Sequence, residues 1–172
     1  MITFKKAQIS DIPNIVKLVN SAYRGESAKV GWTTEADILG GQRIDSEGIQ
    51  EMILKPSARI ELGLAADHRI LGCVYLEHKE DSLYLGMLTV NPHLQSKGLG
   101  KELLQRSEEI ALELGLQQIV LEVISIRSEL IAFYERRGYQ RTGRTAPFPE
   151  HDPRFGLPKT KGLIFEEFIK KF

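Results

Sequence analysis

The sequence predicts an α/β (α+β) domain in which a mixed, mostly antiparallel central sheet is flanked by helices. Three observations carry this prediction. Three apolar runs of strand length follow one another across short polar turns, a long amphipathic segment comes directly after the third run, and a further apolar run and a second amphipathic segment come later. In chain order, the expected elements are β-α-α-β-β-β-α-β-α-β-β. We expect one domain over residues 1–172, which is long enough to bury a sizeable core.

The first two expected elements are a short strand and an amphipathic helix. The strand covers residues 2–7, where apolar and polar residues partly alternate. The helix covers residues 11–23, because Ser10 is a good N-cap and Pro13 falls in the first turn, where its missing N–H costs nothing. One face of this helix is apolar and is formed by Ile12, Ile15, Val16 and Val19.

A polar loop and a second helix follow. Residues 23–45 are rich in glycine and polar residues, which is typical of a loop. Within the loop we expect a short helix that starts at Thr34, because Asp37 three residues later completes a variant of the capping box. The second helix is expected over residues 46–55, directly before Pro56.

The middle of the chain predicts an antiparallel meander and a long helix. Strand-like runs over residues 58–66, 70–78 and 82–90 are separated by the sequences ADHR and KEDS, both short enough for hairpin turns. The amphipathic helix is expected next, over residues 97–114, and Gly115 is a natural residue to end it.

The last part of the chain alternates strands with one helix. Residues 117–124 are a near-continuous apolar run, as expected of a strand that is covered on both faces. Ser128 is expected to cap a helix over residues 129–137, which Gly138 stops. The remaining expected elements are a short strand near Tyr139, a proline-rich loop over residues 146–159 and a final strand over residues 162–169.

Composition narrows the class of protein. Lysine plus arginine balance aspartate plus glutamate at 23 each, so no nucleic-acid partner is expected. No run approaches the ~18 apolar residues that span a bilayer, and the N-terminus lacks an apolar leader, so we expect no membrane partner and a cytoplasmic location. Cys73 is the only cysteine, which excludes an internal disulfide. The histidines at 68, 78, 93 and 151 lack the spacing of a zinc site, so we expect no metal.

One short motif points to phosphate binding. The sequence QSKGLG, residues 95–100, lies between the third strand of the meander and the long helix, where bare backbone N–H groups are offered to an anion. It is not a P-loop, because residue 95 is glutamine and Glu102 follows Lys101. It is not the dinucleotide fingerprint, because Leu103 stands where a third glycine is required. The alternative is structural, with two glycines that simply end a strand.

The remaining pattern, Q-x-x-G-x-G between a strand and a long helix, resembles motif A of the GCN5-related N-acetyltransferase (GNAT) family, the pyrophosphate loop for acetyl-CoA. The sequence LEVISIRSELIAFYERRGYQRTG, residues 121–143, resembles the second half of the same domain. The resemblance covers most of the chain and is strongest over residues 83–143. Arg127 departs from the pattern, because many members have asparagine there, and that contact is not carried over.

The resemblance implies that acetyl-CoA binds as a co-substrate. The strand before the loop would splay from its neighbour, with Gly86 at the bulge, and would offer its backbone to the pantetheine arm. A backbone N–H near Leu88 would polarise the thioester carbonyl. The implied cofactor-binding residues are Leu88, Thr89, Val90, Gln95, Ser96, Lys97, Gly98, Leu99, Gly100 and Lys101.

The implied reaction is acetyl transfer from the thioester to an amine. The resemblance places the hydroxyl of Tyr134 beside the sulfur, where it would protonate the departing thiolate; core packing of an aromatic ring is the alternative. An ammonium group must lose a proton before it attacks, and Glu77 and Glu35 are the candidates for the general base.

The acceptor site is expected on the long irregular segments, residues 24–45 and 146–159, because loops carry specificity. Trp32, the sole tryptophan, would wall this site together with Thr33 and Thr34; a hydrophobic plug under the loop is the alternative. The expected acceptor is a primary amine of a small molecule. The alternatives are an amine of a protein or peptide, and a non-catalytic CoA-binding regulatory module. A homodimer is compatible with the sequence.

Overall fold

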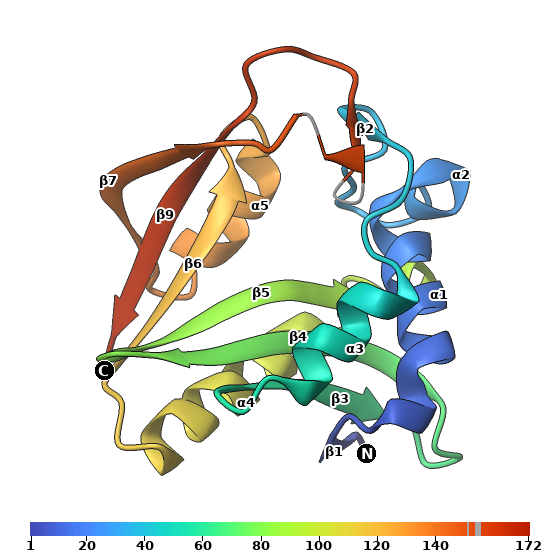
Figure 1. Cartoon of the computed structure of the whole chain (residues 1–172). Coiled ribbons are helices and arrows are strands. Elements are labelled where there is room, and N and C mark those ends of the chain that lie inside the picture. Colours follow the sequence, from blue (N-terminus) through green and yellow to red (C-terminus); the bar gives the residue numbers. More distant parts are fainter. Residues whose placement is uncertain (151, 154–155) are drawn as a thin grey trace.

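The computed structural model describes residues 1–150, 152–153 and 156–172. These residues form a seven-stranded sheet in the order β1-β3-β4-β5-β6-β9-β7, in which β5 and β6 pair in parallel and the other neighbours pair antiparallel (Figure 1). The strands are β1 (Thr3–Lys6), β3 (Ala58–Leu64), β4 (Ile70–Lys79), β5 (Ser82–Val90), β6 (Gln118–Ile124), β7 (Gln140–Pro147) and β9 (Ile164–Lys171). The predicted mixed, mostly antiparallel sheet is confirmed, and so is the order of its main elements.

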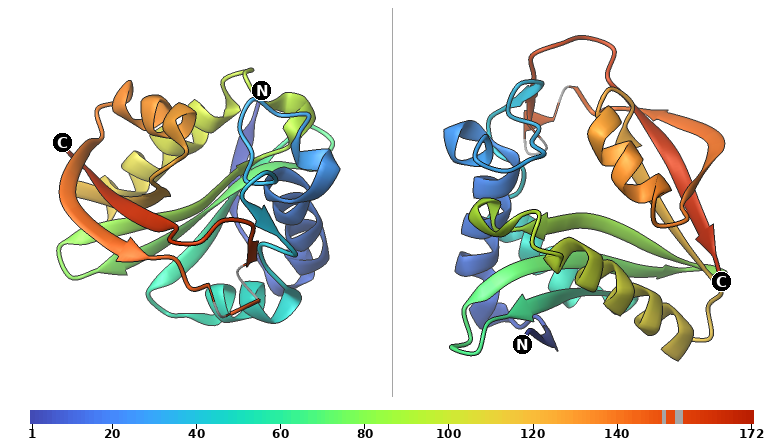
Figure 2. Two further views of the ribbon diagram at one scale, coloured as in Figure 1. Left: turned by 90° about the horizontal axis from the view of Figure 1, so that it is seen from above. Right: turned by 180° about the vertical axis from the view of Figure 1, so that it is seen from behind.

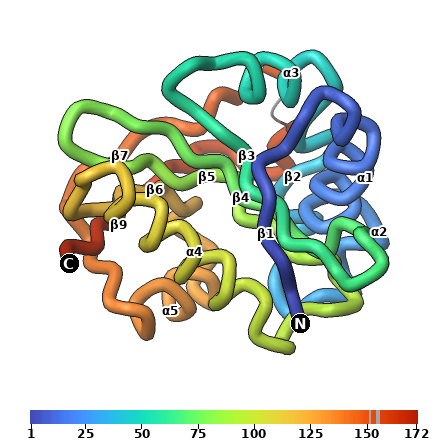
Figure 3. Tube along the Cα trace, turned by 90° about the horizontal axis from the view of Figure 1, so that it is seen from below, coloured from blue at the N-terminus to red at the C-terminus, as the bar shows by residue number. Residues whose placement is uncertain are grey.

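Four helices cover the two faces of the sheet (Figures 2 and 3). Helices α1 (Ile12–Tyr23) and α3 (Ser46–Leu54) pack on one face, and α4 (Leu99–Glu113) and α5 (Ser128–Glu135) pack on the other. Each face has its own apolar core, because successive side chains of a strand point to opposite sides. Along β4, for example, Tyr75 packs with α1, whereas Leu76 packs with α4.

The sheet divides between β5 and β6. These strands pair only where residues 83–85 face residues 119–121; beyond this point they diverge (Figure 1). The bulge that accompanies the division lies at Met87, which has a left-handed φ of 52°, and Gly86 is still paired with Tyr75. Residues two apart in a regular strand point to the same face of the sheet, but here Leu85 packs with α4 and Met87 packs with α1. The bulge therefore turns the side chains that follow it to the opposite face. The predicted splay is therefore present, one residue after the predicted glycine.

Two long loops meet above the division. The short strands β2 (Leu39–Gly40) and β8 (Leu157–Pro158) pair antiparallel and tie the segment after α1 to the segment before β9 (Figure 1). Lys159 strengthens this tie, because its backbone N–H donates to Ile38 at 2.8 Å and its ammonium donates to Ala36 at 2.6 Å. The loops therefore form a closed connection rather than two free ends.

Several element boundaries differ from the predictions. Ser10 does not cap α1; it lies in a 3₁₀ turn over Ile9–Asp11, and Asp11 directly precedes the helix. The helix expected at Thr34 is only a turn, in which the hydroxyl of Thr34 accepts from the N–H of Ala36 at 3.1 Å. A short α2 (Gly25–Ala28), which was not expected, lies earlier in the same loop.

The later boundaries also shift. Ser128 is the first residue of α5 rather than its cap. Strand β7 is longer than the short strand expected near Tyr139, because it continues to Pro147 by pairing with β9. The loop expected over residues 146–159 includes residues 151, 154 and 155, which lie outside the described residues. Within the described ranges, no helix combines the length and apolar character that a bilayer crossing needs.

Candidate active site

The motif at residues 95–100 forms a sharp turn that ends in an uncapped helix. Ser96 and Gly98 both have left-handed backbones, with φ values of 67° and 89°, and α4 begins directly after Gly98. The first hydrogen bond of the helix runs from the N–H of Glu102 to the carbonyl of Gly98 at 3.0 Å. The N–H groups of residues 99–101 precede this bond and have no partner within the helix. They are available to an anion at the positive end of the helix dipole.

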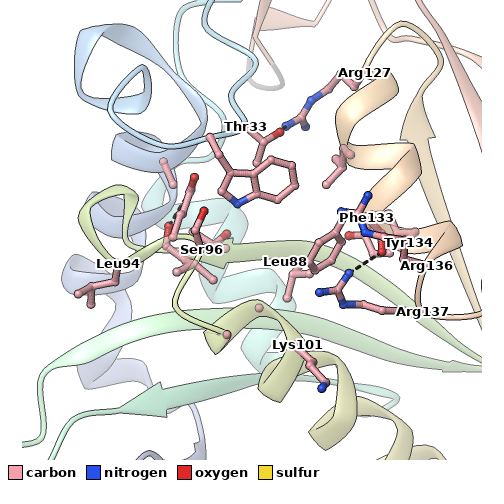
Figure 4. Close-up of a pocket in the computed structure, with 18 of the residues that line it drawn as sticks. Thr33, Leu88, Leu94, Ser96, Lys101, Arg127, Phe133, Tyr134, Arg136 and Arg137 are labelled. Carbon is pink, nitrogen blue, oxygen red and sulfur yellow. Dashed lines mark hydrogen bonds between the residues drawn. The ribbon is translucent and has the colours of Figure 1, made fainter.

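A cavity of about 390 Å³ lies over this turn (Figure 4). The predicted residues that line it are Leu88, Thr89, Val90, Gln95, Ser96, Gly98, Gly100 and Lys101. Two other predicted residues, Lys97 and Leu99, are not in its lining; the side chain of Leu99 is buried in the core. The structure therefore brings most of the predicted cofactor residues onto one wall.

The opposite wall comes from α5 and from the loop after α1 (Figure 4). Phe133 lies between Trp32, with ring centroids 5.7 Å apart, and Arg137, whose guanidinium is 3.7 Å from the ring centroid. Arg136 completes this wall. Phe133, which lies in α5, and Arg136 and Arg137, which directly follow this helix, were not predicted, although the sequence FYERR carries two cations and an aromatic ring at the end of a helix.

Two of the three residues expected at the acceptor site lie on this first cavity instead. Trp32 and Thr33 line it, and Trp32 is not in the lining of the neighbouring cavity. Thr34 lines neither of the two cavities, because its hydroxyl is turned to the backbone of Ala36. Trp32 is 41% exposed, so it is a wall of the cavity rather than a buried plug.

A second cavity of about 350 Å³ lies in the division between β5 and β6. Its walls are largely apolar, and its described charged residues are Arg24, Glu35, Arg43, Glu122 and Arg127. Among the described residues, the two cavities share Tyr23, Leu88, Arg127, Leu130 and Tyr134. They therefore meet at the bulged end of β5, against the first turns of α5.

Tyr134 stands at this junction. Its ring packs edge-on against Phe133 and Tyr139, with centroids 5.3 and 5.6 Å away. Desolvation by burial raises the pKa of its phenol. Tyr134 therefore keeps its proton over the physiological range and is able to donate it to a group at the junction.

Leu88 is held in place through its backbone. The hydroxyl of Tyr23 donates to the carbonyl of Leu88 at 2.5 Å, and Thr89 is anchored through its hydroxyl, which donates to the carbonyl of Met87 at 2.9 Å. Burial raises the pKa of Tyr23, so this donor stays protonated. The bulged segment is thus fixed by side chains where the β4–β5 ladder is interrupted.

Glu35 is enclosed by two arginines. Arg24 donates to one of its oxygens, and Nη1 of Arg127 donates to the other at 2.9 Å. Arg127 also donates to the hydroxyl of Thr33 at 2.7 Å, which in turn donates to Glu129 at 3.1 Å. Both oxygens of Glu35 are occupied, which favours a structural role, fastening the loop to α5, over the predicted role of general base. Arg127, the residue that departs from the pattern described above, supplies this link.

The other predicted base lies elsewhere. Glu77 lines neither cavity; its carboxylate accepts from Tyr75 at 2.8 Å and pairs with Lys55 at 2.6 Å. Desolvation favours the neutral acid of Glu77, but the hydrogen bonds from Lys55 and Tyr75 outweigh it and lower the pKa. A lowered pKa makes a weaker base.

Glu122 on β6 is a carboxylate in the second cavity that the sequence analysis did not select. Desolvation raises its pKa, and the charge of Glu167, its cross-strand neighbour on β9, raises it further. Tyr84 on β5 lines the same cavity, and burial raises the pKa of its phenol to about 12, with a smaller contribution from the charge of Glu122. Among the described residues, no salt bridge involves Glu122.

Comparison with known proteins gives consistent results. The model of the acetyltransferase (GNAT) family matches residues 19–139. The uncharacterized protein YxbD of Bacillus subtilis (strain 168) is 30% identical over 74 residues, which cover 43% of this chain and 45% of that protein. The chain spans less than half the length of the curated relatives it matches.

Solved structures share the fold. The ribosomal-protein-S18-alanine N-acetyltransferase from Escherichia coli superposes with a TM-score of 0.73 at 15% identity, over 99% of this chain and 94% of that one. The PaiA N-acetyltransferase from Thermoplasma acidophilum, solved in complex with coenzyme A, superposes with a TM-score of 0.71 at 18% identity, over 100% and 99%.

Proposed function

The chain belongs to the acetyltransferase (GNAT) family, and we propose that it is an N-acetyltransferase that moves the acetyl group of acetyl-CoA to a primary amine of a small molecule. Family and fold support acetyl transfer in general. One observation carries the more specific proposal: a cavity over an uncapped helix N-terminus meets a second cavity at Leu88 and Tyr134. Such a pair of cavities offers separate places for a thioester and for an amine that attacks it.

In this proposal the first cavity holds acetyl-CoA. The pyrophosphate lies on the N–H groups of residues 99–101, with Lys101 beside it. The pantetheine arm follows the backbone of residues 88–90 into the division between β5 and β6. Arg136 and Arg137 offer charge to the remaining phosphate, and Trp32 and Phe133 offer aromatic surface to the adenine.

The acyl group would lie at the junction of the two cavities. Glu122 takes a proton from the ammonium group of the acceptor, and the free amine attacks the thioester carbon. A C–N bond forms while the carbonyl electrons move to oxygen, which is stabilised by the N–H of Leu88. Collapse of this intermediate breaks the C–S bond, and Tyr134 donates a proton to the departing thiolate. The second proton of the nitrogen returns, through solvent, to the phenol, and Glu122 releases the first proton to solvent before the next turnover.

The closure of the acceptor side supports a small molecule. The β2–β8 pairing joins the two loops above the division, and Phe148 and Pro149 line the second cavity from one of them. A volume near 350 Å³ is at the lower end of small-ligand sites, which span ~300–1,000 Å³. An extended peptide needs an open groove, so these features favour a small amine over a protein amine.

The proposal is tested in two steps with the whole chain. Calorimetric titration with acetyl-CoA should give saturable binding, and a panel of small amines should then release free CoA with formation of the matching amide. Binding without turnover on any amine or peptide would support the alternative of a non-catalytic CoA-binding module. Faster turnover on peptide N-termini than on every small amine would overturn the small-molecule assignment.

Replacement of the two glycines tests the cofactor loop. Gly98→Asp and Gly100→Asp place a carboxylate where the pyrophosphate should lie, and each should weaken acetyl-CoA binding by at least about tenfold. A β-carbon at Gly100 would meet only ordinary contacts with Phe133 and Val90, so the fold should remain. Gly98 has positive φ, and the strain of its variant is matched by Gly115→Asp, since Gly115 has a φ of 76° and equally open surroundings. Unchanged affinity in both loop variants, with or without an effect at Gly115, would contradict the assignment.

A further inference from the structure

The charges in the second cavity are only partly paired. Arg24 and Arg127 are both bound to Glu35, so this trio is internally connected. Arg43 and Glu122 line the same cavity, and within the described part of the chain no salt bridge involves either side chain. The cavity therefore carries one uncommitted cation and one uncommitted carboxylate.

Arg43 is held in position from two sides. Its backbone N–H donates to the side-chain oxygen of Asn20 at 2.7 Å, and the side-chain amide of Asn20 donates to the carbonyl of the next residue, Ile44, at 2.9 Å. Its guanidinium lies 5.5 Å from the centroid of the Tyr23 ring. Tyr23 in turn holds the carbonyl of Leu88, so the cation lies one side chain away from the reacting end of β5.

The cation acts on the cavity electrostatically. Its charge opposes the rise in the pKa of Tyr23, Cys73 and Tyr84, for each of which burial is the larger cause. Arg43 is half-buried, and among the described residues it pairs with no carboxylate; a ligand that supplies a carboxylate would offset the cost of taking this cation from water. A guanidinium also matches a carboxylate with two parallel hydrogen bonds.

We propose that the acceptor is a primary amine that also carries a carboxylate, of the amino-acid class, and that Arg43 binds this carboxylate. The inference rests on the proposed function, because it names the substrate class of the same site. The ammonium group of the acceptor lies toward Glu122 and its carboxylate toward Arg43. Between them, the apolar wall that includes Met52, Phe148 and Phe165 accepts an uncharged side chain.

The test compares matched acceptors. Leucine, methionine and phenylalanine are each assayed against the corresponding amino-acid amide and the corresponding decarboxylated amine. The amine of the amide is less basic than that of the amino acid, and the decarboxylated amine is more basic. A preference over both analogues therefore does not arise from basicity. For at least one of the three, kcat/KM should favour the carboxylate by about 10- to 100-fold, the range expected of a charge-assisted hydrogen bond.

The matched variants assign this preference to Arg43. Arg43→Gln should reduce the ratio of carboxylated to neutral acceptor to about one, mainly through KM of the carboxylated acceptor, and Arg43→Lys should retain part of it. Arg69→Gln is the control, because Arg69 is exposed and pairs with Asp67 in the β3–β4 turn. The ratio of kcat/KM for carboxylated and neutral acceptors should be the same in this variant as in the wild type.

The outcomes distinguish failure of the carboxylate site at Arg43 from failure of the proposed acetyl transfer. A ratio near one in the wild type, or a ratio that Arg43→Gln leaves unchanged, overturns the carboxylate site while amine acetylation stands. If no amine is acetylated although acetyl-CoA binds, the proposed function fails. Calorimetric titration of the CoA-bound protein with the three amino acids then decides the inference: binding that Arg43→Gln abolishes supports it, and absent or Arg43-independent binding overturns it.

Discussion

Tyr134→Phe should lower the rate of acetyl transfer by about 10²–10⁴-fold, the usual range for loss of a general acid. The substitution keeps the ring and its edge-on contacts with Phe133 and Tyr139, so the fold and the affinity for acetyl-CoA should change little. Burial raises the pKa of the phenol, which makes it a weaker acid than in water. The thiolate forms in the same desolvated junction, and its pKa rises for the same reason, so the donor and the leaving group stay comparable.

The measurement should be a single-turnover rate, because slow product release would hide a slower chemical step in kcat. Tyr139→Phe is a close control. Tyr139 is 1% exposed and lines neither cavity, and its hydroxyl has no hydrogen-bond partner among the described residues, so removal of this hydroxyl should leave the rate unchanged. A single-turnover rate of Tyr134→Phe within about threefold of the wild type would contradict the role of general acid and would support core packing as the function of this ring.

The loop that lines the first cavity was predictable from the sequence because the residues that form it are neighbours in the chain. The glycines at 98 and 100, the helix that follows and the strand that precedes them lie within one short segment, and each has a backbone reason to be where it is. The strands of the meander were predictable for the same reason, since short turns fix which strands are neighbours. The register of the bulge was not, because Met87 adopts a left-handed backbone that its residue type does not indicate.

The acceptor side depends on contacts between distant segments. Glu35 was a reasonable candidate for the base by its place in a polar loop, but Arg127, far along the chain, occupies its second oxygen. Trp32 was expected at the acceptor site, and in the structure it packs against Phe133 in the first cavity, which we propose holds acetyl-CoA. Glu122 stands in an apolar run, LEVI; in the structure its side of β6 is only partly covered, and a single carboxylate in that run was the signal that could have identified it.

Glu122→Gln should lower kcat/KM by about 10²–10⁴-fold near neutral pH, because the amide keeps the size of the side chain but cannot accept the ammonium proton. The loss should shrink as pH rises, since an amine that is already deprotonated in solution needs no base. A loss that stays constant over the whole pH range would indicate a structural effect instead. The same measurement on Glu77→Gln decides between the two carboxylates: a larger loss there would transfer the role to Glu77.

The pH profile of kcat/KM carries a second, independent test of Glu122. A general base must be deprotonated, so kcat/KM should rise with pH through the pKa of Glu122 in the free enzyme. This rising part of the profile is the acid limb, and a raised pKa of Glu122 moves it to higher pH. Part of the rise comes from the charge of Glu167 on β9, which lines neither cavity. Glu167→Gln removes that charge, so it should lower the pKa of Glu122 and shift the acid limb to lower pH. If deprotonation of the acceptor amine sets the acid limb instead, the substitution should not change its position.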